Sequence, residues 1–418
     1  MVRLVPRLPK TRLLLKVGAV LLAGVLGGAA VSAHAATTLP SWVDSWAASP
    51  QSSVLASSTP PTYTNQTLRL IVRMHSGGTS VRVRLANTFG DRDMAFGHVT
   101  VALRTTGAGV TSAHTAKFAG LTSVTVLKGA EVSSDPVTLT VAAGQDLAVS
   151  VYLPTYTGPV TYHRSAHQTS YVSGSGDHAS ETGTGSFGTT ISTWPFLDAV
   201  SVRGGTAPGT IVALGDSITD GSGSTTNTNR RWPDKLSYRL RARTSVPAKS
   251  VVDEGIGGNH VLTDSTSTGG PSALHRLTRD VLVRRGLTDV ILLEGVNDLR
   301  SSDPPATADQ IIAGYQQIID RVHGTGARIF GGTLTPFKGS ARYTDAMEQE
   351  RQKLNAWIKA PGHFDGYIDF AKATGDPADP LRFLPTYDSG DHLHPNDAGY
   401  QAMANAVNLS LFDWSPVS

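Results

Sequence analysis

The first half of the chain alternates apolar and polar positions with the period of a β-strand. In residues 68–74, Leu68, Leu70, Val72 and Met74 form one set and Arg69, Ile71 and Arg73 the other, and the same alternation recurs in residues 81–85 and 147–153. Turn residues such as His75-Ser76-Gly77-Gly78 separate these runs. Short alternating runs between turns are typical of antiparallel sheets. We therefore predict that residues 36–203 form an all-β sandwich domain.

The pattern changes after "RGGTAPG", residues 203–209. Beyond it, short apolar runs predict strands at 211–214, 289–293, 328–331 and 366–370, and helical periodicity predicts helices at 233–243, 307–323, 342–359 and 396–408. Strands that alternate with helices indicate a mainly parallel sheet covered on both faces, in which sites form at the carboxyl ends of the strands. We predict an α/β domain over residues 210–418, joined to the first domain by a linker at 204–209.

The first 35 residues have the pattern of a secretory leader. A basic start is followed by an apolar run over residues 17–31 and by the small-x-small sequence Ala33-His34-Ala35. This pattern predicts a signal peptide over residues 1–35, cleaved near Ala35/Ala36, and a secreted protein, extracellular or periplasmic. The alternative is a membrane anchor, but the run is shorter than the roughly 20 residues of a spanning helix. We expect no integral membrane segment after cleavage.

Charge and cysteine content exclude several function classes. The chain has a formal net charge of +3, but the predicted leader contains five basic residues and no acid, so the remainder is net negative. No Lys/Arg run of the kind that follows phosphates remains, and we predict no nucleic-acid partner. The chain contains no cysteine, which excludes disulfides, thiolate metal sites and a cysteine nucleophile.

The stretch "IVALGDSITDG", residues 211–221, places a serine at the end of an apolar strand. Ser217 would then lie in the crevice at the carboxyl end of the sheet, where the following helix begins and backbone N–H groups point outwards. A serine in this position is a candidate nucleophile. The alternative interpretation is that Asp216 and Ser217 only cap a turn, which is common for these residues next to glycine.

A nucleophilic hydroxyl needs a base, and "DSGDHLHPNDAGY", residues 388–400, provides one. Asp391 stands three residues before His394, so its carboxylate can accept the Nδ1 proton and leave Nε2 facing a hydroxyl. His392 is a rival base, but Asp391 at the preceding position is poorly placed to orient it. The alternative is a metal site. Since no third histidine lies nearby and no His-Glu-x-x-His motif occurs, we predict no metal and no cofactor.

Acyl transfer also needs hydrogen-bond donors for the oxyanion. Two segments at predicted strand ends contain candidates: "EGIGGNH", residues 254–260, and "LLEGVNDLR", residues 292–300. The glycine pair in the first allows close backbone approach, so the N–H of Gly258 can face the site. In the second, the side-chain amide of Asn297 can donate. The alternatives are an ordinary glycine loop and a turn or helix cap.

Together the four segments resemble the consensus blocks of the SGNH hydrolase superfamily, also called the GDSL lipase/esterase family. The blocks are "GDSITDG", "GIGGN", "GVND" and "DHLHPN", and the resemblance spans residues 210–408. It implies a flavodoxin-like three-layer α/β fold and an ester hydrolase without a cofactor. It also implies that Ser217 is the nucleophile, His394 the base and then the acid, and Asp391 the residue that orients His394. The implied oxyanion hole consists of the backbone N–H groups of Ser217 and Gly258 with the side chain of Asn297.

These observations predict a secreted serine carboxylic-ester hydrolase that acts through an acyl-enzyme on short acyl or acetyl esters, including those on polysaccharides. One alternative is a lipase or phospholipase that acts on longer acyl esters. Another is a non-catalytic secreted carbohydrate-binding protein. An α/β-hydrolase is not favoured because the Gly-x-Ser-x-Gly elbow is absent. The "GTGSFG" sequence, residues 183–188, fits a dinucleotide motif, but no apolar strand runs directly into it.

Two features of the first half have open interpretations. Its aromatic residues Trp42, Trp46, Tyr63 and Tyr152 form either a platform for sugars or part of the core. The polar segment 161–178 contains several histidines and precedes the predicted domain junction. It either lines the cleft or only crosses from one element to the next.

Overall fold

The computed structural model describes residues 41–413, apart from 266, 268 and 301–303. The predicted signal peptide and its cleavage site lie outside the described residues. The described residues belong to a single compact unit. Within these ranges, no helix combines the length and apolar character that crossing a bilayer requires.

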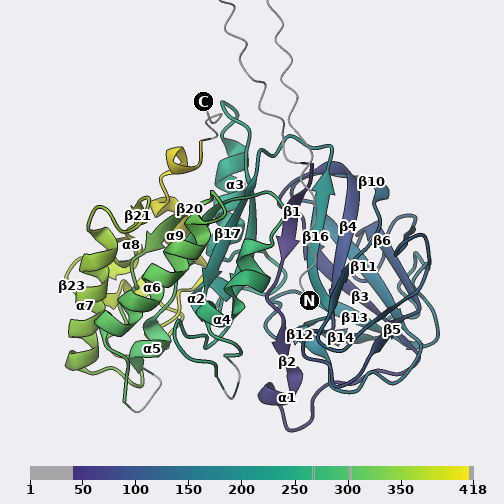
Figure 1. Cartoon of the computed structure of the whole chain (residues 1–418), viewed down its shortest axis with the longest axis horizontal. Coiled ribbons are helices and arrows are strands. Elements are labelled where there is room, and N and C mark those ends of the chain that lie inside the picture. The colour runs from purple at the N-terminus through teal and green to yellow at the C-terminus, as the bar shows by residue number, and fades with distance from the viewer. Residues whose placement is uncertain (1–40, 266, 268, 301–303, 414–418) are drawn as a thin grey trace, which may run out of the picture. The chain divides into compact units, whose positions relative to one another are not determined.

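Residues 43–203 are rich in β-strands (Figure 1). The strands are β1 (Val43–Ala47), β2 (Gln51–Ser52), β3 (Gln66–Arg73), β4 (Gly78–Ala86), β5 (Met94–Phe96), β6 (His98–Leu103), β7 (His114–Ala116), β8 (Val124–Val126), β9 (Glu131–Ser133), β10 (Val137–Val141), β11 (Asp146–Leu153), β12 (Thr161–His163), β13 (Ser170–Ser175), β14 (Thr189–Ile191), β15 (Trp194–Pro195) and β16 (Leu197–Arg203), with the short helix α1 (Ser53–Ala56) after β2. One sheet has the order β1-β16-β4-β10, with β9 paired to β4, and another has the order β14-β13-β3-β11-β6-β7.

The two larger sheets share one apolar core. Leu68, Leu70 and Val72 of β3 and Val81, Val83 and Leu85 of β4 belong to the same buried cluster, although these strands lie in different sheets. Alternation places these side chains on one face of each strand, and burying both faces together removes them from water. The three predicted alternating strands are confirmed as β3, β4 and β11, and their pairings are antiparallel.

The aromatic residues considered as a sugar platform are mostly in the interior. Trp42, Trp46 and Tyr63 are at most 8% exposed. Trp46 packs edge to face against Trp194, with ring centroids 4.8 Å apart. Of the two open interpretations, the structure therefore favours a core role for these three residues.

The second half contains a five-stranded parallel sheet in the order β18-β17-β19-β20-β21. Its strands are β17 (Thr210–Gly215), β18 (Ser250–Gly255), β19 (Leu287–Leu293), β20 (Arg328–Gly332) and β21 (Tyr367–Ile368). The helices are α2 (Ser217–Asp220), α3 (Trp232–Ala242), α4 (Ala273–Leu277), α5 (Val296–Arg300), α6 (Ala308–His323), α7 (Asp345–Lys359), α8 (Phe370–Thr374) and α9 (Asp397–Ala406), with a π-helical turn at Thr278–Leu282, 3₁₀ turns at Pro385–Tyr387 and Leu409–Phe412, and the hairpin β22 (Gly375–Asp376) and β23 (Asp379–Phe383).

In chain order this sheet reads 2-1-3-4-5, the order of flavodoxin-like sheets. Right-handed crossovers in this order place α3 on one face and α6 and α7 on the other. The contacts agree, because α3 packs against α9 whereas α6 packs against α4 and α7. The expectation of a mainly parallel sheet with alternating helices is confirmed, and the carboxyl ends of β17, β18 and β19 lie side by side.

Some elements differ from the sequence-based expectation. The sequence does not predict strand β18, because acidic residues interrupt its apolar run. It indicates only the end of this strand, in the segment 254–260. Strand β21 is shorter than the predicted 366–370, since the side chain of Asp369 accepts a hydrogen bond from the N–H of Lys372 and starts α8. Helix α7 begins at Asp345 rather than 342, where the side chain of Thr344 caps it.

Buried charged groups connect the β-rich region with the parallel sheet. Arg284 donates to Asp198 of β16 at 2.8 Å and lies 2.5 Å from Glu254 at the end of β18. Glu254 also accepts a hydrogen bond from Ser49, which follows β1, at 2.7 Å. Residues 204–209 join β16 to β17. The division into two domains at this segment stays a prediction.

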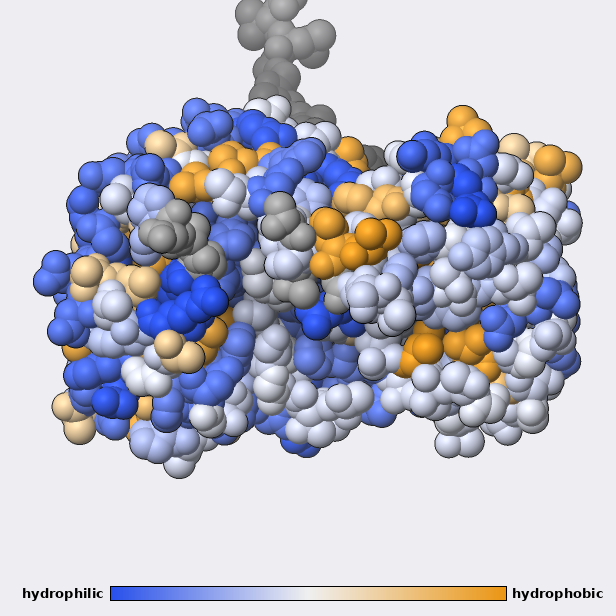
Figure 2. Space-filling model, turned by 90° about the horizontal axis from the view of Figure 1, so that it is seen from below, coloured by the Kyte–Doolittle hydropathy of each residue, from blue (hydrophilic) through white to orange (hydrophobic). Residues whose placement is uncertain are grey.

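One face of the molecule offers little continuous apolar area. Figure 2 shows a face that is mostly hydrophilic, with small, separate apolar patches. Large exposed apolar side chains among the described residues are few: Val54, Leu55, Leu121, Leu127, Tyr156, Val283 and Tyr367.

Candidate active site

Ser217 lies at the carboxyl end of the central strand β17, as the first residue of α2. The side chain of Asp216 accepts a hydrogen bond from the N–H of Ile218 at 2.9 Å and so caps α2. The Oγ atom of Ser217 lies 2.7 Å from Nε2 of His394. Asp216 therefore has the capping role that the alternative interpretation gave it, while Ser217 contacts a histidine.

The ring of His394 is held on its other side by Asp391. Nδ1 of His394 lies 2.5 Å from Oδ2 of Asp391, and the N–H groups of Leu393 and His394 donate to Oδ1 at 3.0 and 2.8 Å. Burial alone would raise the pKa of Asp391, but the hydrogen bonds from the ring and backbone of His394 outweigh it and lower the pKa to about 2. The carboxylate is therefore ionised and accepts a hydrogen bond from the Nδ1–H group, which leaves Nε2 to accept the hydroxyl proton of Ser217.

His392, the rival base, has its own carboxylate. Its Nδ1 atom lies 2.5 Å from Oδ2 of Asp388, and its side chain is 50% exposed. None of the contacts of the described residues joins His392 to Ser217, so the geometry favours His394 as the base. In the described part of the chain, no three His, Asp or Glu side chains are grouped as a metal ion would require.

The two candidate oxyanion segments are bonded to each other. Gly258 follows β18 and has a φ of +79°, in the left-handed region that favours glycine. Asn297 lies in α5, and its side-chain amide donates to the backbone carbonyl of Asn259 at 2.9 Å. Asp298, the next residue, accepts from the N–H groups of Val261 and Leu262 at 2.8 and 3.1 Å. The structure thus places the side chain of Asn297 against Asn259, the residue that follows Gly258.

A third set of contacts joins the glycine segment to the helix that contains Ser217. The N–H of Gly257 donates to Oδ2 of Asp220 at 3.1 Å. A Cβ atom at Gly255 would lie 2.1 Å from the backbone nitrogen of Asp220, so only glycine allows the segment to approach α2 this closely. The segment 255–258 is therefore packed directly against the end of α2.

Sequence reasoning missed Arg276 in α4. Its side chain is fully buried, and its guanidinium donates to the carbonyl oxygens of Gly215 at 2.9 Å and Glu254 at 2.7 Å, to Oδ1 of Asn259 at 2.8 Å and to Oγ of Ser49 at 2.8 Å. It therefore connects the ends of β17 and β18, the glycine segment and the β-rich region. No local pattern could have identified it, because these acceptors lie 17 to 227 residues away in the chain.

Two buried carboxyl groups beside the site have raised pKa values. Burial raises the pKa of Asp216 to about 7, and the neighbouring Asp298 adds to the effect. Burial likewise raises the pKa of Asp253 in β18 to about 7, although Arg231 acts in the opposite direction. Both groups therefore change charge near neutral pH, close to the segments that hold Ser217 and Gly258.

The sequence of the second half of the chain matches a known family. Residues 213–402 match the GDSL-like lipase/acylhydrolase family. The match confirms the family resemblance that the four sequence blocks indicate. The matched region begins in β17, ends in α9 and includes the strands of the parallel sheet between them. A comparison with curated proteins finds no match.

Several solved structures are similar to part of the chain. They include an aryl esterase of M. smegmatis (16% identity, TM-score 0.39, covering 47% of this chain and 95% of that one) and a carbohydrate acetylesterase family member of Sinorhizobium meliloti (16%, 0.38, 47% and 94%). A GDSL-like lipase of Bacteroides thetaiotaomicron has 18% identity and a TM-score of 0.36, with 47% of this chain and 84% of that one covered.

Proposed function

We propose that this protein is a secreted serine carboxylic-ester hydrolase that acts through an acyl-enzyme. The observation that carries the proposal is the continuous hydrogen-bonded chain from Ser217 through His394 to Asp391 at the carboxyl end of the parallel sheet. This is the nucleophile, base and orienting carboxylate that acyl transfer requires. The family match to GDSL-like acylhydrolases supports the same reaction class.

The proposed mechanism uses only side chains and backbone groups of the chain. Ser217 Oγ attacks the ester carbonyl carbon while Nε2 of His394 accepts the hydroxyl proton. The oxyanion then accepts hydrogen bonds from the N–H groups of Ser217 and Gly258 and from the side chain of Asn297. His394 protonates the leaving alcohol, and the carbon–oxygen bond to the alcohol breaks. Water, deprotonated by the same histidine, attacks the acyl-enzyme and releases the acid and Ser217.

Two features of the sequence support a proposal for the substrate class. The predicted signal peptide indicates export, and the sequence after this leader contains no long apolar run that would form a lid. We propose short acyl or acetyl esters as substrates, including those on polysaccharides outside the cell.

The proposal is tested by measuring acid release from the purified mature protein. The substrates are a series of p-nitrophenyl esters of increasing acyl length and acetylated xylan, and Ser217→Ala is the blank. We expect Ser217-dependent release that is fastest with acetyl and falls with chain length. A rate that rises with chain length would instead indicate a lipase. Release that is absent, or unchanged in Ser217→Ala, would contradict the proposed mechanism.

A further inference from the structure

The polar segment 161–178 reaches the site through one histidine. His163, at the end of β12, is 3% exposed and contacts Asp220 of the GDSL-like region. Its Nε2 atom is 3.0 Å from Oδ1 of Asp220, and its Nδ1 atom is 2.9 Å from the backbone carbonyl oxygen of Ser49. Asp220 is itself only 2% exposed. The segment therefore does not simply cross the surface, because its histidine is part of the buried contact with α2.

Both ring nitrogens of His163 face hydrogen-bond acceptors, a carboxylate and a carbonyl. Only the protonated ring can donate to both. Burial alone would lower the pKa of His163, but the charge of Asp220 and the hydrogen bonds to it outweigh burial and raise the pKa. The pair is therefore a buried imidazolium and carboxylate.

Asp220 uses its second oxygen for the oxyanion segment. Oδ2 accepts the N–H of Gly257 at 3.1 Å, immediately before Gly258. Asp220 is also the last residue of α2, the helix that begins at Ser217. One carboxylate thus connects the β-rich region, the nucleophile helix and the segment that presents the Gly258 N–H.

We propose that His163 is a positioning residue for the oxyanion hole, which fixes Asp220 so that its carboxylate holds Gly257 and directs the N–H of Gly258 toward the reacting carbonyl. This inference rests on the proposed function. Because His163 belongs to the β-rich region, this region supplies part of the support of the catalytic site.

The segment 255–258 needs this support because its backbone is flexible. Glycines at 255, 257 and 258 leave the backbone many conformations, and an oxyanion donor stabilises the transition state only when it is held in place beforehand. Without the imidazolium, Asp220 would be a buried carboxylate that has lost a partner, and it would protonate or turn toward Arg231. In either case its bond to Gly257 is weakened.

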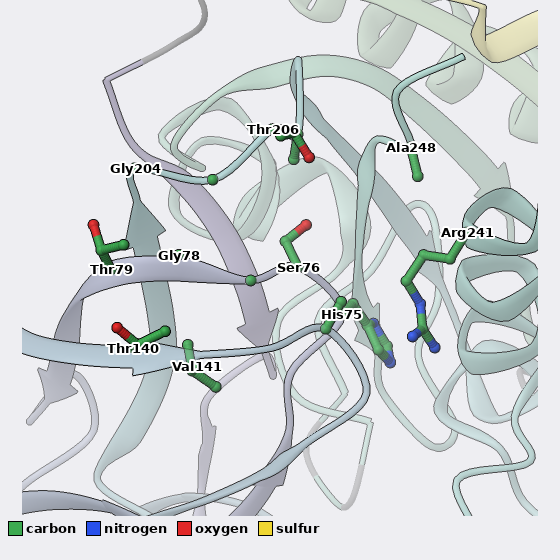
Figure 3. A pocket seen from close by; sticks show the side chains of 14 residues that line it. His75, Ser76, Gly78, Thr79, Thr140, Val141, Gly204, Thr206, Arg241 and Ala248 are labelled. Atoms are coloured by element: carbon green, nitrogen blue, oxygen red, sulfur yellow. The ribbon is translucent and has the colours of Figure 1, made fainter. Parts of the chain in front are cut away.

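The chain contains a matched control. His75, between β3 and β4, also reaches from the β-rich region into buried partners: Nε2 lies 3.1 Å from Oδ1 of Asp234 and Nδ1 lies 2.6 Å from the carbonyl oxygen of Val251. Its side chain is equally buried at 3% exposure. Figure 3 shows His75 at the wall of a cavity that Thr206, Arg241 and Ala248 also line. These two hydrogen bonds involve neither the 255–258 segment nor α2.

The experiment compares His163→Asn, His163→Gln and His75→Asn in the full mature protein. A glutamine amide nitrogen reaches the position of Nε2 and can still donate to Asp220, whereas an asparagine amide is one methylene shorter and cannot. We expect His163→Asn to lower kcat for p-nitrophenyl acetate by about 10-fold to 100-fold with a small change in KM. His163→Gln should recover most of this loss, and His75→Asn should leave kcat within about 2-fold.

Hydrogen exchange gives a second readout that does not depend on activity. We expect the amides of residues 255–260 to exchange about 10-fold faster or more in His163→Asn than in the wild type, and to be unchanged in His75→Asn. Asp220→Asn, which preserves the shape of the side chain, should show the same faster exchange and lower kcat. It serves as the test if His163→Asn does not fold.

The outcomes separate the two proposals. Wild-type exchange and kcat in His163→Asn, or in Asp220→Asn, would overturn the positioning role. Equal losses in His163→Asn and His75→Asn would also overturn it, because they would show a general effect of the buried contact. If the wild type has no Ser217-dependent hydrolysis, the proposed function fails, and the exchange of residues 255–260 still decides whether His163 holds the segment.

Discussion

Nε2 of His394 lies 2.7 Å from Oγ of Ser217, although 177 residues separate them in the chain. Further bonds between the same two parts of the chain support this contact. Asp397 accepts from the N–H and the Oγ1 of Thr225 at 2.9 and 2.7 Å and from Arg230 at 2.8 Å. The turn that holds His394 is thus attached to the segment that follows Ser217.

The first prediction compares the substitutions of His394 and His392. His394→Ala should lower kcat for p-nitrophenyl acetate by several orders of magnitude, because the serine then has no base. His392→Ala should retain kcat within about 2-fold, since His392 bonds Asp388 and not Ser217. Both variants are compared with the wild type by steady-state kinetics, with circular dichroism as a check of folding. A large loss in His392→Ala alone would reverse the assignment of the base.

Removal of the Asn297 side chain tests the oxyanion hole. Asn297→Ala should lower kcat by about 10²-fold or more, because a donor aimed at the oxyanion is lost. Asn297→Asp should lower it at least as much, since it places a carboxylate where negative charge develops. The measurement is kcat and KM on the same ester, and an unchanged kcat in Asn297→Ala would exclude this residue from the hole.

The lowered pKa of Asp391 predicts a loss of stability in acid. Because the folded-state pKa of about 2 lies below the ordinary value of 3.8, the contribution of Asp391 to stability is fully present above pH 3.8 and is lost as the pH falls toward 2. The difference in Tm between the wild type and Asp391→Asn should therefore shrink over this range. A difference that is constant from about pH 5 to about pH 2 would show that the folded protein does not shift this group.

The raised pKa of Asp253 predicts the opposite dependence of stability on pH. Its folded-state pKa of about 7 lies above the ordinary 3.8, so its contribution to stability is lost as the pH rises from 3.8 to 7 and the buried carboxyl ionises. Asp253→Asn keeps an acceptor for the N–H of Gly255, which Asp253 binds at 2.9 Å. We expect the Tm of Asp253→Asn relative to the wild type to rise between about pH 4 and about pH 7 and then level off. Parallel Tm curves for the two proteins would contradict this.

Replacement of Arg276 should destabilise the folded protein. Arg276→Met should lower the free energy of unfolding by about 3–5 kcal/mol, because several buried acceptors lose a charged donor at once. Lys353, whose pair with Asp309 is exposed, is the control, and Lys353→Ala should cost less than about 1 kcal/mol. Urea unfolding of both variants measures the difference. Similar small losses in both would show that the Arg276 contacts contribute little.

Local patterns in the sequence are sufficient to predict many of the strands and helices of this protein. The alternation of Leu68, Leu70 and Val72 predicts β3, and the apolar run that ends at Gly215 predicts β17 with Ser217 just beyond it. These predictions succeed because strand period, helix period and turn chemistry depend on neighbouring residues. The residue types of Ser217, His394 and Asp391 also indicate their chemistry, since a hydroxyl, an imidazole and a carboxylate are the groups that acyl transfer uses.

The tertiary structure decides which of these residues meet. The position of Asp391 in the sequence favours His394 over His392, but only the folded chain places His394 against Ser217. Arg276 and His163 carry no local pattern, since most of the acceptors they bind lie on distant elements. Burial in the folded protein also sets the pKa values of Asp216 and Asp253. Hydrogen bonds and charges act over a few ångströms in space, so their partners are fixed only when the whole chain has packed.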